Sequence, residues 1–269
     1  MLRLLLLHMK NYALVTGASK GIGREISLKL AALGYPLLLV SRNEGELSRL
    51  SAFIEEEFKV KARFLAIDLA IDGSARNVAA WCTSNNYPVQ ILINNAGYGL
   101  WGDFEKIDVD GQLNMISLNI STLVALTYLL LPILKREQAA YVLNVASTAA
   151  YQAVPTLAVY AATKAFVLSF SRAIATELKH TNVSVSCLCP GPTDTGFAER
   201  AGMDAIKELA EKFNMSPDEV AKTAIKGMFK RKAEIVPGFL NKLSAMAVSF
   251  VPKKLVETIA ANLYKTPEQ

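Results

Sequence analysis

Short, continuously apolar runs alternate along the chain with longer segments in which apolar residues recur at helical spacing. The runs predict strands over Tyr12–Val15, Leu37–Val40, Ala62–Ile67, Ile91–Asn94, Tyr141–Val145, Val183–Leu188 and Glu234–Val236. The helical spacing predicts helices over Ile22–Leu33, Gly45–Phe58, Ser74–Asn85, Gly111–Lys135 and Val159–His180. Strands that are apolar at every position are buried on both faces, which favours a parallel sheet. We therefore expect an α/β fold: a doubly wound parallel sheet of about seven strands with helices on both faces.

Length and composition fit one domain. The chain has 269 residues, 52% of them apolar, so it can bury a large core. Proteins of this class and size are commonly one domain, and no repeat, low-complexity tract or linker is visible, so we expect a single domain over residues 1–269. The net charge of +5 is modest, and no interleaving of basic and aromatic residues suggests a nucleic-acid partner.

The cysteines indicate the compartment. Cys82, Cys187 and Cys189 have no metal-ligand spacing and are an odd number for disulfides. Cys187 and Cys189 are two residues apart in a predicted strand, so they face the same side of it. Buried free thiols are the favoured interpretation, which predicts a reducing, cytoplasmic location, and we expect no metal site.

Two apolar segments fall outside the regular pattern. The stub containing Leu4–Leu7 is too short to span a membrane and has no small-residue cleavage site before the first strand. Met9 as the physiological start and an edge segment are both open for it, an anchor is the least favoured reading, and whether residues 1–8 are native is undecided. The segment Pro237–Pro252 contains Asn241 and Lys242, which argue against a spanning helix. A C-terminal cap or a subunit contact is favoured there, with attachment to a membrane surface as a further alternative.

A glycine-rich turn joins the first strand to the first helix. Gly17 permits a tight turn, Gly21 lets the backbone approach a ligand, and Gly23 lets the helix pack closely on the strand. Backbone N–H groups and the helix dipole at such a turn attract a pyrophosphate. The spacing Gly-x-x-x-Gly-x-Gly differs from the standard Gly-x-Gly-x-x-Gly, so the turn alone is a moderate signal.

Tyr160 and Lys164 are four residues apart, and Ser147 precedes the tyrosine by thirteen. On a helix this spacing places the phenol and the ammonium on one face. A phenol has a pKa of about 10, and a nearby ammonium would lower it toward neutral pH. An isolated Tyr-x-x-x-Lys is common by chance and more often consists of a buried ring and a solvated stem.

The combination of these motifs is much more specific. Together with Asn94-Asn95-Ala96-Gly97 and Pro190-Gly191, they resemble the short-chain dehydrogenase/reductase family over about residues 11–195. The resemblance implies a Rossmann-like fold and interconversion of a carbonyl and an alcohol. It implies that Tyr160 is the general acid/base, that Ser147 orients the substrate oxygen, and that Lys164 lowers the phenol pKa and binds the nicotinamide ribose. Asn119 matches the family's catalytic asparagine, which holds a water on a proton relay; Asn114 is a competing candidate with less suitable spacing.

The resemblance also implies which residues bind the cofactor. Ser41-Arg42-Asn43, after the second predicted strand, lacks the acid that binds the ribose 2′-hydroxyl of NAD(H). Arg42, with Lys20 as a second cation, suits the 2′-phosphate, so NADP(H) is expected over NAD(H). Asp68 is expected to receive the adenine, with a helix N-cap as the alternative. The expected contacts are Gly17, Ser19, Lys20, Gly21, Ile22, Gly23, Arg42, Asn43, Asp68, Leu69, Asn95, Ala96, Gly97, Tyr160, Lys164, Pro190, Gly191, Thr193 and Thr195.

The substrate end is less specified by sequence. Residues 192–215 are expected to cover the substrate through Phe197, Met203, Ile206 and Phe213. The remaining wall is expected from Tyr98, Gly99, Leu100, Trp101, Ala149, Tyr151, Val154 and Leu157. This apolar lining favours reduction of a largely apolar ketone or oxoacyl compound, although the same residues could be ordinary core. Neither the physiological substrate, nor the stereochemistry, nor the preferred direction follows from the sequence.

Two alternatives to a reductase are considered. A non-catalytic NADP(H) sensor or scaffold on the same fold typically lacks the tyrosine or the lysine, and both are present here. An epimerase or dehydratase usually has a Gly-x-x-Gly-x-x-Gly turn and a larger substrate domain, and both are absent from the sequence. In the resembling family the helices around Gly111–Lys135 and Val159–His180 commonly meet a second subunit, so a homodimer or homotetramer is expected.

Overall fold

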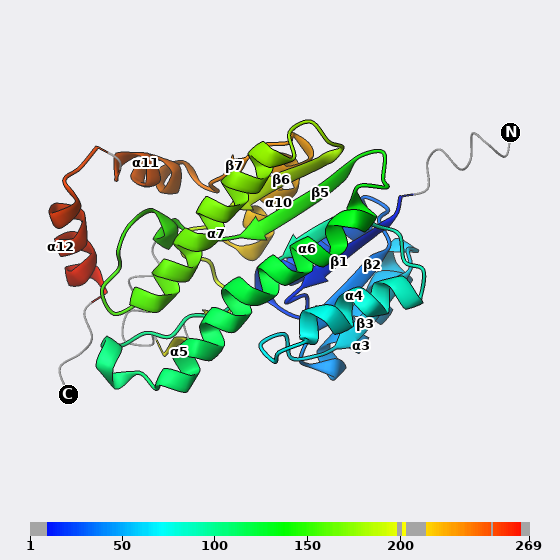
Figure 1. Cartoon of the computed structure of the whole chain (residues 1–269), viewed down its shortest axis with the longest axis horizontal. Helices are drawn as coiled ribbons and strands as arrows, with labels where there is room; N and C mark the ends of the chain where they lie inside the picture. Colours follow the sequence, from blue (N-terminus) through cyan, green and yellow to red (C-terminus); the bar gives the residue numbers. More distant parts are fainter. Residues whose placement is uncertain (1–9, 198–200, 203–213, 249, 265–269) are drawn as a thin grey trace, which may run out of the picture.

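One parallel sheet forms the centre of the molecule (Figure 1). The computed structural model describes residues 10–197, 201–202, 214–248 and 250–264. The strands are β1 (Tyr12–Thr16), β2 (Leu37–Ser41), β3 (Ala62–Ala66), β4 (Val89–Asn94), β5 (Ala140–Val145), β6 (Val183–Leu188) and β7 (Glu234–Ile235). Their order is β3-β2-β1-β4-β5-β6-β7. The order changes direction between β1 and β4, so the predicted doubly wound α/β fold is confirmed.

Helices cover both faces of this sheet. They are α2 (Gly21–Ala32), α3 (Glu44–Phe58), α4 (Ser74–Ser84), α5 (Val109–Ile116), α6 (Leu123–Leu134), α7 (Ala158–Glu177) and α10 (Pro217–Phe229). Helices α11 (Phe239–Ala247) and α12 (Lys253–Leu263) lie beyond the edge of the sheet (Figure 1). Leu14 of β1 packs in a cluster with residues of α4 and α6. Its neighbours Ala13 and Val15 pack in a second cluster with residues of α2, α3 and α10. Each buried strand is therefore apolar on both sides, which is why its sequence shows no alternation.

The helix expected over Gly111–Lys135 is continuous but not uniform. Between α5 and α6 the residues Ser117–Thr122 form a π-helical turn, η2, in which one more residue per turn is accommodated. By length and mean hydropathy, Val109–Leu134 could cross a membrane. Leu126, Leu130 and Leu134 are fully buried against the sheet, however, as expected for a core helix.

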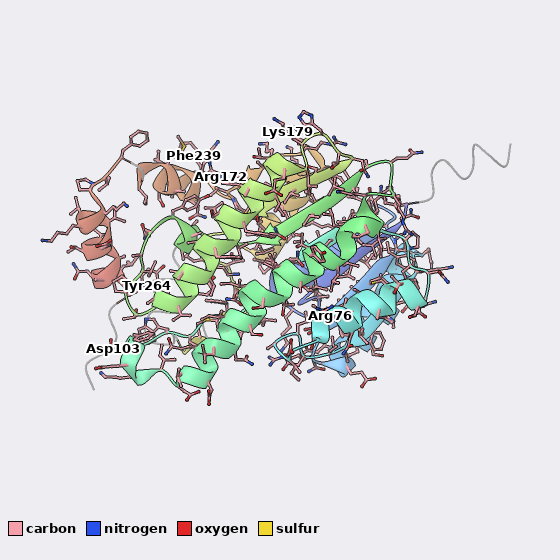
Figure 2. All side chains as sticks on the ribbon, viewed as in Figure 1. Arg76, Asp103, Arg172, Lys179, Phe239 and Tyr264 are labelled. Atoms are coloured by element: carbon pink, nitrogen blue, oxygen red, sulfur yellow. The ribbon has the colours of Figure 1, made fainter. Side chains whose placement is uncertain are left out.

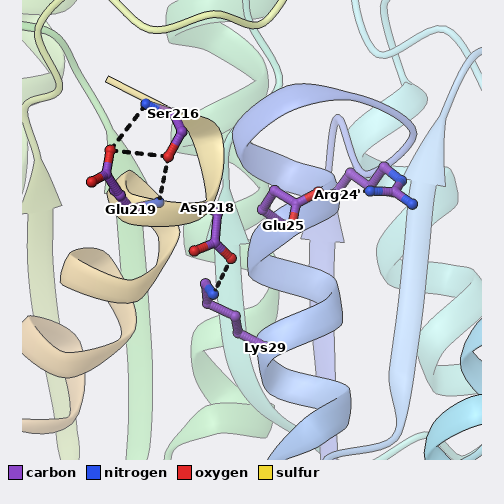
Figure 3. A network of polar contacts seen from close by, with 6 residues as sticks. All are labelled: Arg24, Glu25, Lys29, Ser216, Asp218 and Glu219. Atoms are coloured by element: carbon purple, nitrogen blue, oxygen red, sulfur yellow. Dashed lines mark hydrogen bonds and ion pairs between the residues drawn. The ribbon is translucent and has the colours of Figure 1, made fainter. Parts of the chain in front are cut away.

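Like α11 and α12, helix α10 was not predicted by the apolar pattern. A capping box begins it: Ser216 Oγ accepts from the Glu219 N–H at 3.2 Å, and the Glu219 carboxylate accepts from the Ser216 N–H at 3.3 Å. Figure 3 shows this box beside the ion pair that joins Asp218 to Lys29 of α2. Ser-Pro-Asp-Glu is a readable helix start, so the signal for α10 was present in the sequence.

Candidate active site

A cleft of about 1560 Å³ runs along the carboxyl ends of the strands. It brings together Ser147, Tyr160, Lys164 and nearly all of the expected cofactor contacts. Its lining includes Gly17, Ser19, Lys20, Gly21, Ile22, Arg42, Asn43, Asp68, Leu69, Asn95, Ala96, Gly97, Pro190, Gly191, Thr193 and Thr195. Gly23 is not part of the lining and lies beneath the turn. The expected contacts in the lining come from the segments that follow strands β1 to β6. These strands are parallel, so their carboxyl ends lie at one edge of the sheet and bring distant parts of the chain together.

The conformation of the glycine turn is fixed by close contacts with its neighbours. Gly17 and Gly21 have φ values of 64° and 54°, which favour glycine. A Cβ on Gly23 would stand 2.3 Å from the Gly17 carbonyl oxygen, so helix α2 can approach the turn only without a side chain there. Asn95 braces the same turn, because its Nδ2 donates to the Thr16 and Gly17 carbonyl oxygens at 3.0 and 3.2 Å. The result is a backbone cradle at the N-terminus of a helix, suited to an anionic group.

Charged residues lie at the β2 end of the cleft. The Arg42 guanidinium is 3.7 Å from the Asp68 carboxylate, and Lys20 pairs with Glu46 at 3.0 Å. Both cations are well exposed, so these pairs add little to stability and leave the cations accessible to a ligand. Asp68 does not cap α4, which begins at Ser74 after Gly73; its other oxygen accepts from the Ala70 N–H within its own loop. Asn43 caps α3 through the Glu46 N–H, and Glu46 itself is a cleft residue that sequence reasoning missed.

Tyr160 and Lys164 lie on the first turns of α7, and both are nearly inaccessible to solvent. Burial raises the pKa of Tyr160 to about 12, while its hydrogen bond with Ser147 lowers that pKa and the Tyr264 phenol raises it further. Burial lowers the pKa of Lys164 to about 8, against an opposing effect of Cys187 and Cys189. The sequence-based expectation of a lowered phenol pKa is therefore wrong for this structure, because desolvation disfavours both charged forms.

The Lys164 ammonium is anchored rather than free. Its Nζ donates to the Val145 carbonyl at 2.9 Å and lies 5.7 Å from the centre of the Tyr160 ring. A Cβ on Gly97 would be 3.3 Å from this Nζ and 2.9 Å from Asn119 Oδ1. Gly97 therefore leaves room for both polar groups to pack against the backbone, and Lys164 lines the cleft beside it.

Asn119 occupies the π-helical turn and does not line the cleft. Its Oδ1 accepts from the Tyr98 N–H at 3.1 Å, and its Nδ2 donates to the Tyr98 carbonyl and Thr163 Oγ1, each at 3.0 Å. It thus ties the chain after β4 to α7, close to Lys164. The competing candidate Asn114 instead accepts from the Tyr98 hydroxyl at 2.9 Å.

The loop after β6 closes the cleft over the glycine turn. Thr193 forms a bridge with Met215, and the Asp194 N–H donates to the Met215 carbonyl at 3.2 Å. A Cβ on Gly21 would be 2.8 Å from Thr195, so this loop and the turn are in close contact. Of the residues expected to cover the substrate, Met203, Ile206 and Phe213 lie outside the described residues.

The substrate end has a partly different lining from the one expected. Phe197 packs against Tyr160 with ring centres 5.2 Å apart, and Tyr98, Ala149 and Leu157 also face the cleft. Five expected wall residues are absent from the lining: Gly99, Leu100, Trp101, Tyr151 and Val154.

The last described residues complete this end of the cleft. Leu263 and Tyr264 line it, and Tyr264 is labelled at the end of α12 in Figure 2. The Tyr264 carbonyl accepts from Trp101 Nε1 at 3.1 Å and from Thr156 Oγ1 at 2.9 Å. Thr156 has a φ of 65°, which is unusual for a β-branched residue and indicates that packing holds its loop in place. Only the spacing Val256, Ala260, Tyr264 could have suggested a buried helical face here.

Comparison with known proteins gives a consistent result. Residues 11–206 match the short chain dehydrogenase family. Among curated relatives, the very-long-chain 3-oxoacyl-CoA reductase of Candida glabrata is 32% identical over 191 residues, covering 65% of this chain and 54% of that protein. An uncharacterized oxidoreductase of Staphylococcus epidermidis is 29% identical over 197 residues, 73% of this chain and 84% of that one. The chain thus spans about half the length of the fungal relative.

Solved structures share the whole architecture. A short-chain dehydrogenase from Sphingobium yanoikuyae in complex with NADPH has a TM-score of 0.80 at 26% identity, and the alignment covers 96% of this chain and 98% of that one. A 7beta-hydroxysteroid dehydrogenase has a TM-score of 0.84 at 23% identity over 93% of this chain and 96% of that one, which shows the fold alone.

Proposed function

Because this chain belongs to the short-chain dehydrogenase/reductase family of NAD(P)-binding oxidoreductases, we propose that it is an NADPH-dependent carbonyl reductase. The observation that carries the proposal is the placement of Ser147, Tyr160 and Lys164 at one end of a cleft whose other end is a glycine cradle. Such a cradle suits a pyrophosphate, and the three polar side chains suit proton transfer to a carbonyl oxygen.

The residues present fit a dinucleotide along the cleft. Gly17 and Gly21 line the cleft with their backbone, where phosphates would lie, and Lys164 lines it where ribose hydroxyls would lie. Arg42 and Lys20 support NADP(H) over NAD(H), since each is exposed enough to exchange its carboxylate partner for a 2′-phosphate. Relatives in solved structures carry either cofactor: one is described as a complex with NADPH and another as a complex with NAD.

The protonation state of Tyr160 supports reduction. With a pKa of about 12, the phenol keeps its proton at neutral pH and can donate it to a developing alkoxide. Bound NADPH would supply the hydride to the carbonyl carbon. Ser147 donates a hydrogen bond to the same oxygen and orients it, while Lys164 in its charged form stabilises the phenolate left behind. The products are the alcohol and the oxidised cofactor.

The substrate class that the cleft supports best is a largely apolar ketone or 3-oxoacyl thioester. Phe197, Leu157 and Leu263 give the substrate end an apolar lining. Several fungal relatives are named very-long-chain 3-oxoacyl-CoA reductases, which agrees with an acyl substrate. The buried free thiols support a cytoplasmic location.

A homodimer or homotetramer is part of the proposal. Leu113, Tyr128 and Phe166 are exposed apolar residues on α5, α6 and α7, and Phe166 stacks on Phe170 with ring centres 5.8 Å apart. This surface would be covered by the same surface of a second copy. Light scattering that shows only monomer would contradict this part.

The test is a substrate panel with a matched variant. NADPH consumption is followed with apolar ketones, aldehydes and 3-oxoacyl thioesters, for the wild type and for Tyr160→Phe. The variant keeps the ring packing but lacks the acid, so we expect turnover to fall by about 10²–10⁴-fold with cofactor binding retained. Near wild-type turnover of the variant would refute the catalytic assignment. NADPH binding without turnover of any panel member by the wild type would favour the sensor or scaffold alternative.

A further inference from the structure

Helices α11 and α12 carry the largest group of exposed apolar side chains outside the proposed subunit contact. Figure 1 shows both helices together at one end of the molecule, beyond the edge of the sheet. Phe239, labelled in Figure 2, is 81% exposed, and Phe250 between the helices is 86% exposed. The other large exposed apolar residues of the two helices are Leu240, Leu243, Met246, Leu255, Ile259 and Leu263. We call these eight residues, Phe239 and Phe250 included, the terminal apolar surface.

The exposure follows the periodicity of each helix. On α12 the exposed residues Leu255, Ile259 and Leu263 recur every four positions. The adjacent stripe of Val256 and Ala260 is buried against the protein. Helix α12 therefore has an inner apolar stripe that holds it in place and an outer apolar stripe that is about half exposed to solvent. On α11 the inner side is held by Ala245, which is buried.

The charged residues beside this surface are mostly lysines. Lys242, Lys253 and Lys254 are exposed on the two helices, and Glu257 is the single acidic residue between Phe239 and Leu263. Apolar side chains bordered by lysines match the chemistry of an anionic lipid headgroup region, where the lysine stems pass through apolar material and the ammonium groups reach the phosphates.

We propose that the terminal apolar surface docks on a lipid bilayer that contains anionic headgroups. The helices would lie in the plane of the interface with Phe250 inserted between them. A second copy of the chain is a poorer occupant, because a two-fold contact would place the three lysines of each copy against those of the other with one glutamate each to compensate. The surface is also continuous with the cleft, since α12 ends in Leu263 and Tyr264, which line the substrate end.

Because the surface adjoins the cleft, docking would help an apolar substrate to enter, and this role rests on the proposed function. An apolar carbonyl compound partitions into the bilayer, so its path into the cleft is shortest when the mouth faces the membrane. Docking itself does not depend on catalysis, and it is therefore tested separately.

The test is co-sedimentation of the full chain with vesicles. One set contains phosphatidylcholine alone, and the other contains phosphatidylcholine with phosphatidylglycerol. We expect binding to the anionic vesicles and about 100-fold weaker binding of the double variant Leu243→Ser, Phe250→Ser, because each large apolar side chain removed from the interface contributes about tenfold or more. Ile71→Ser is the matched control: Ile71 is 65% exposed and follows β3 at the opposite edge of the sheet.

A charge variant separates the two contributions. Lys253→Glu with Lys254→Glu is expected to abolish the preference for anionic vesicles. The proposal fails if the wild type stays in solution with both vesicle types, or if the double serine variant sediments as the wild type does. Conversion of a wild-type dimer to a monomer by the serine variant, without vesicle binding by either, would assign the surface to a second copy instead. NADPH binding and turnover with the substrate panel are measured in every variant, so failed docking and a failed reductase assignment give different results.

Discussion

The two ends of the cleft are built in different ways. At the cofactor end, backbone and side-chain atoms are packed so closely that Gly17, Gly21 and Gly23 leave no room for a Cβ without displacing neighbouring atoms. At the substrate end, α12 is held by two hydrogen bonds to one carbonyl, that of Tyr264, and by a narrow buried stripe. A rigid, preorganised site binds a nucleotide more tightly, because little conformational freedom is lost on binding. The outer wall of the substrate end, by contrast, can change without disturbing the fold.

The strongest test of the rigid end is Gly23→Ala. Its methyl group would overlap the Gly17 carbonyl and push α2 away from the turn, so we expect a loss of about 3 kcal/mol of stability and of measurable NADPH binding. Gly45→Ala is the control, because a Cβ on Gly45 meets no atom closer than 3.6 Å. Thermal unfolding and NADPH titration check both. Normal NADPH affinity in Gly23→Ala would mean that the turn is less constrained than the distances indicate.

The substitution Lys164→Met tests the effect of burying a lysine beside Tyr160. Turnover should fall by about 10²–10⁴-fold, while the free energy of unfolding at neutral pH should rise by about 1–3 kcal/mol, because the wild-type cation is buried at a cost. The pKa of about 8 in the folded state is below the ordinary lysine value, so this cost is full below pH 8. The stability advantage of the variant should shrink as pH rises through the interval between the two pKa values.

Denaturant unfolding at several pH values measures this advantage. A variant that is less stable than the wild type throughout would show that the hydrogen bond to the Val145 carbonyl outweighs the desolvation of the ammonium. In that case Lys164 would stabilise the fold as well as serve the chemistry.

Arg42→Ser tests cofactor selection at the rigid end. Loss of a charge-assisted contact with the 2′-phosphate should weaken NADPH binding by about 10- to 100-fold and leave NADH binding unchanged. Arg63→Ser is the control, since Arg63 is similarly exposed but pairs with Glu55 outside the cleft. Equal weakening for both cofactors would mean that Arg42 only shapes the loop.

The smallest effect on activity is expected from substitutions at the substrate end. Trp101→Phe combined with Thr156→Val removes both hydrogen bonds to the Tyr264 carbonyl. We expect KM for long apolar substrates to rise about tenfold, with little change for a small ketone and none in NADPH affinity. Steady-state kinetics with a short and a long substrate measure the difference. An equal change for both substrates would show that α12 supports the catalytic groups rather than the outer wall.

The fold was predictable because burial on both faces of a parallel sheet leaves a strong, local signature. Runs such as Leu37–Val40 could be recognised without knowledge of their partners. Helix α10 does not show in the apolar spacing, but the Ser216–Glu219 capping box that begins it is an equally local signal.

The candidate site was predictable where its motifs are contiguous in sequence. Gly17, Gly21, Asn95–Gly97 and the Tyr160–Lys164 pair line one cleft, whereas Gly23 does not. The electrostatics were not predictable: spacing shows that a phenol and an ammonium share a helix face, but the pKa of each depends on burial by residues from distant segments. The environment of Asn119 was not predictable either. The groups that hydrogen-bond its side-chain amide belong to the chain after β4 and to α7.

By itself, the sequence determined the sheet, the glycine turn and the proposed acid/base pair, because each is set by residues close together in the chain. The tertiary structure alone decided that burial raises the pKa of Tyr160 and lowers that of Lys164, and that Leu263 and Tyr264 line the substrate end. Desolvation and steric clearance arise only when segments far apart in sequence are brought into contact, and no local pattern records them.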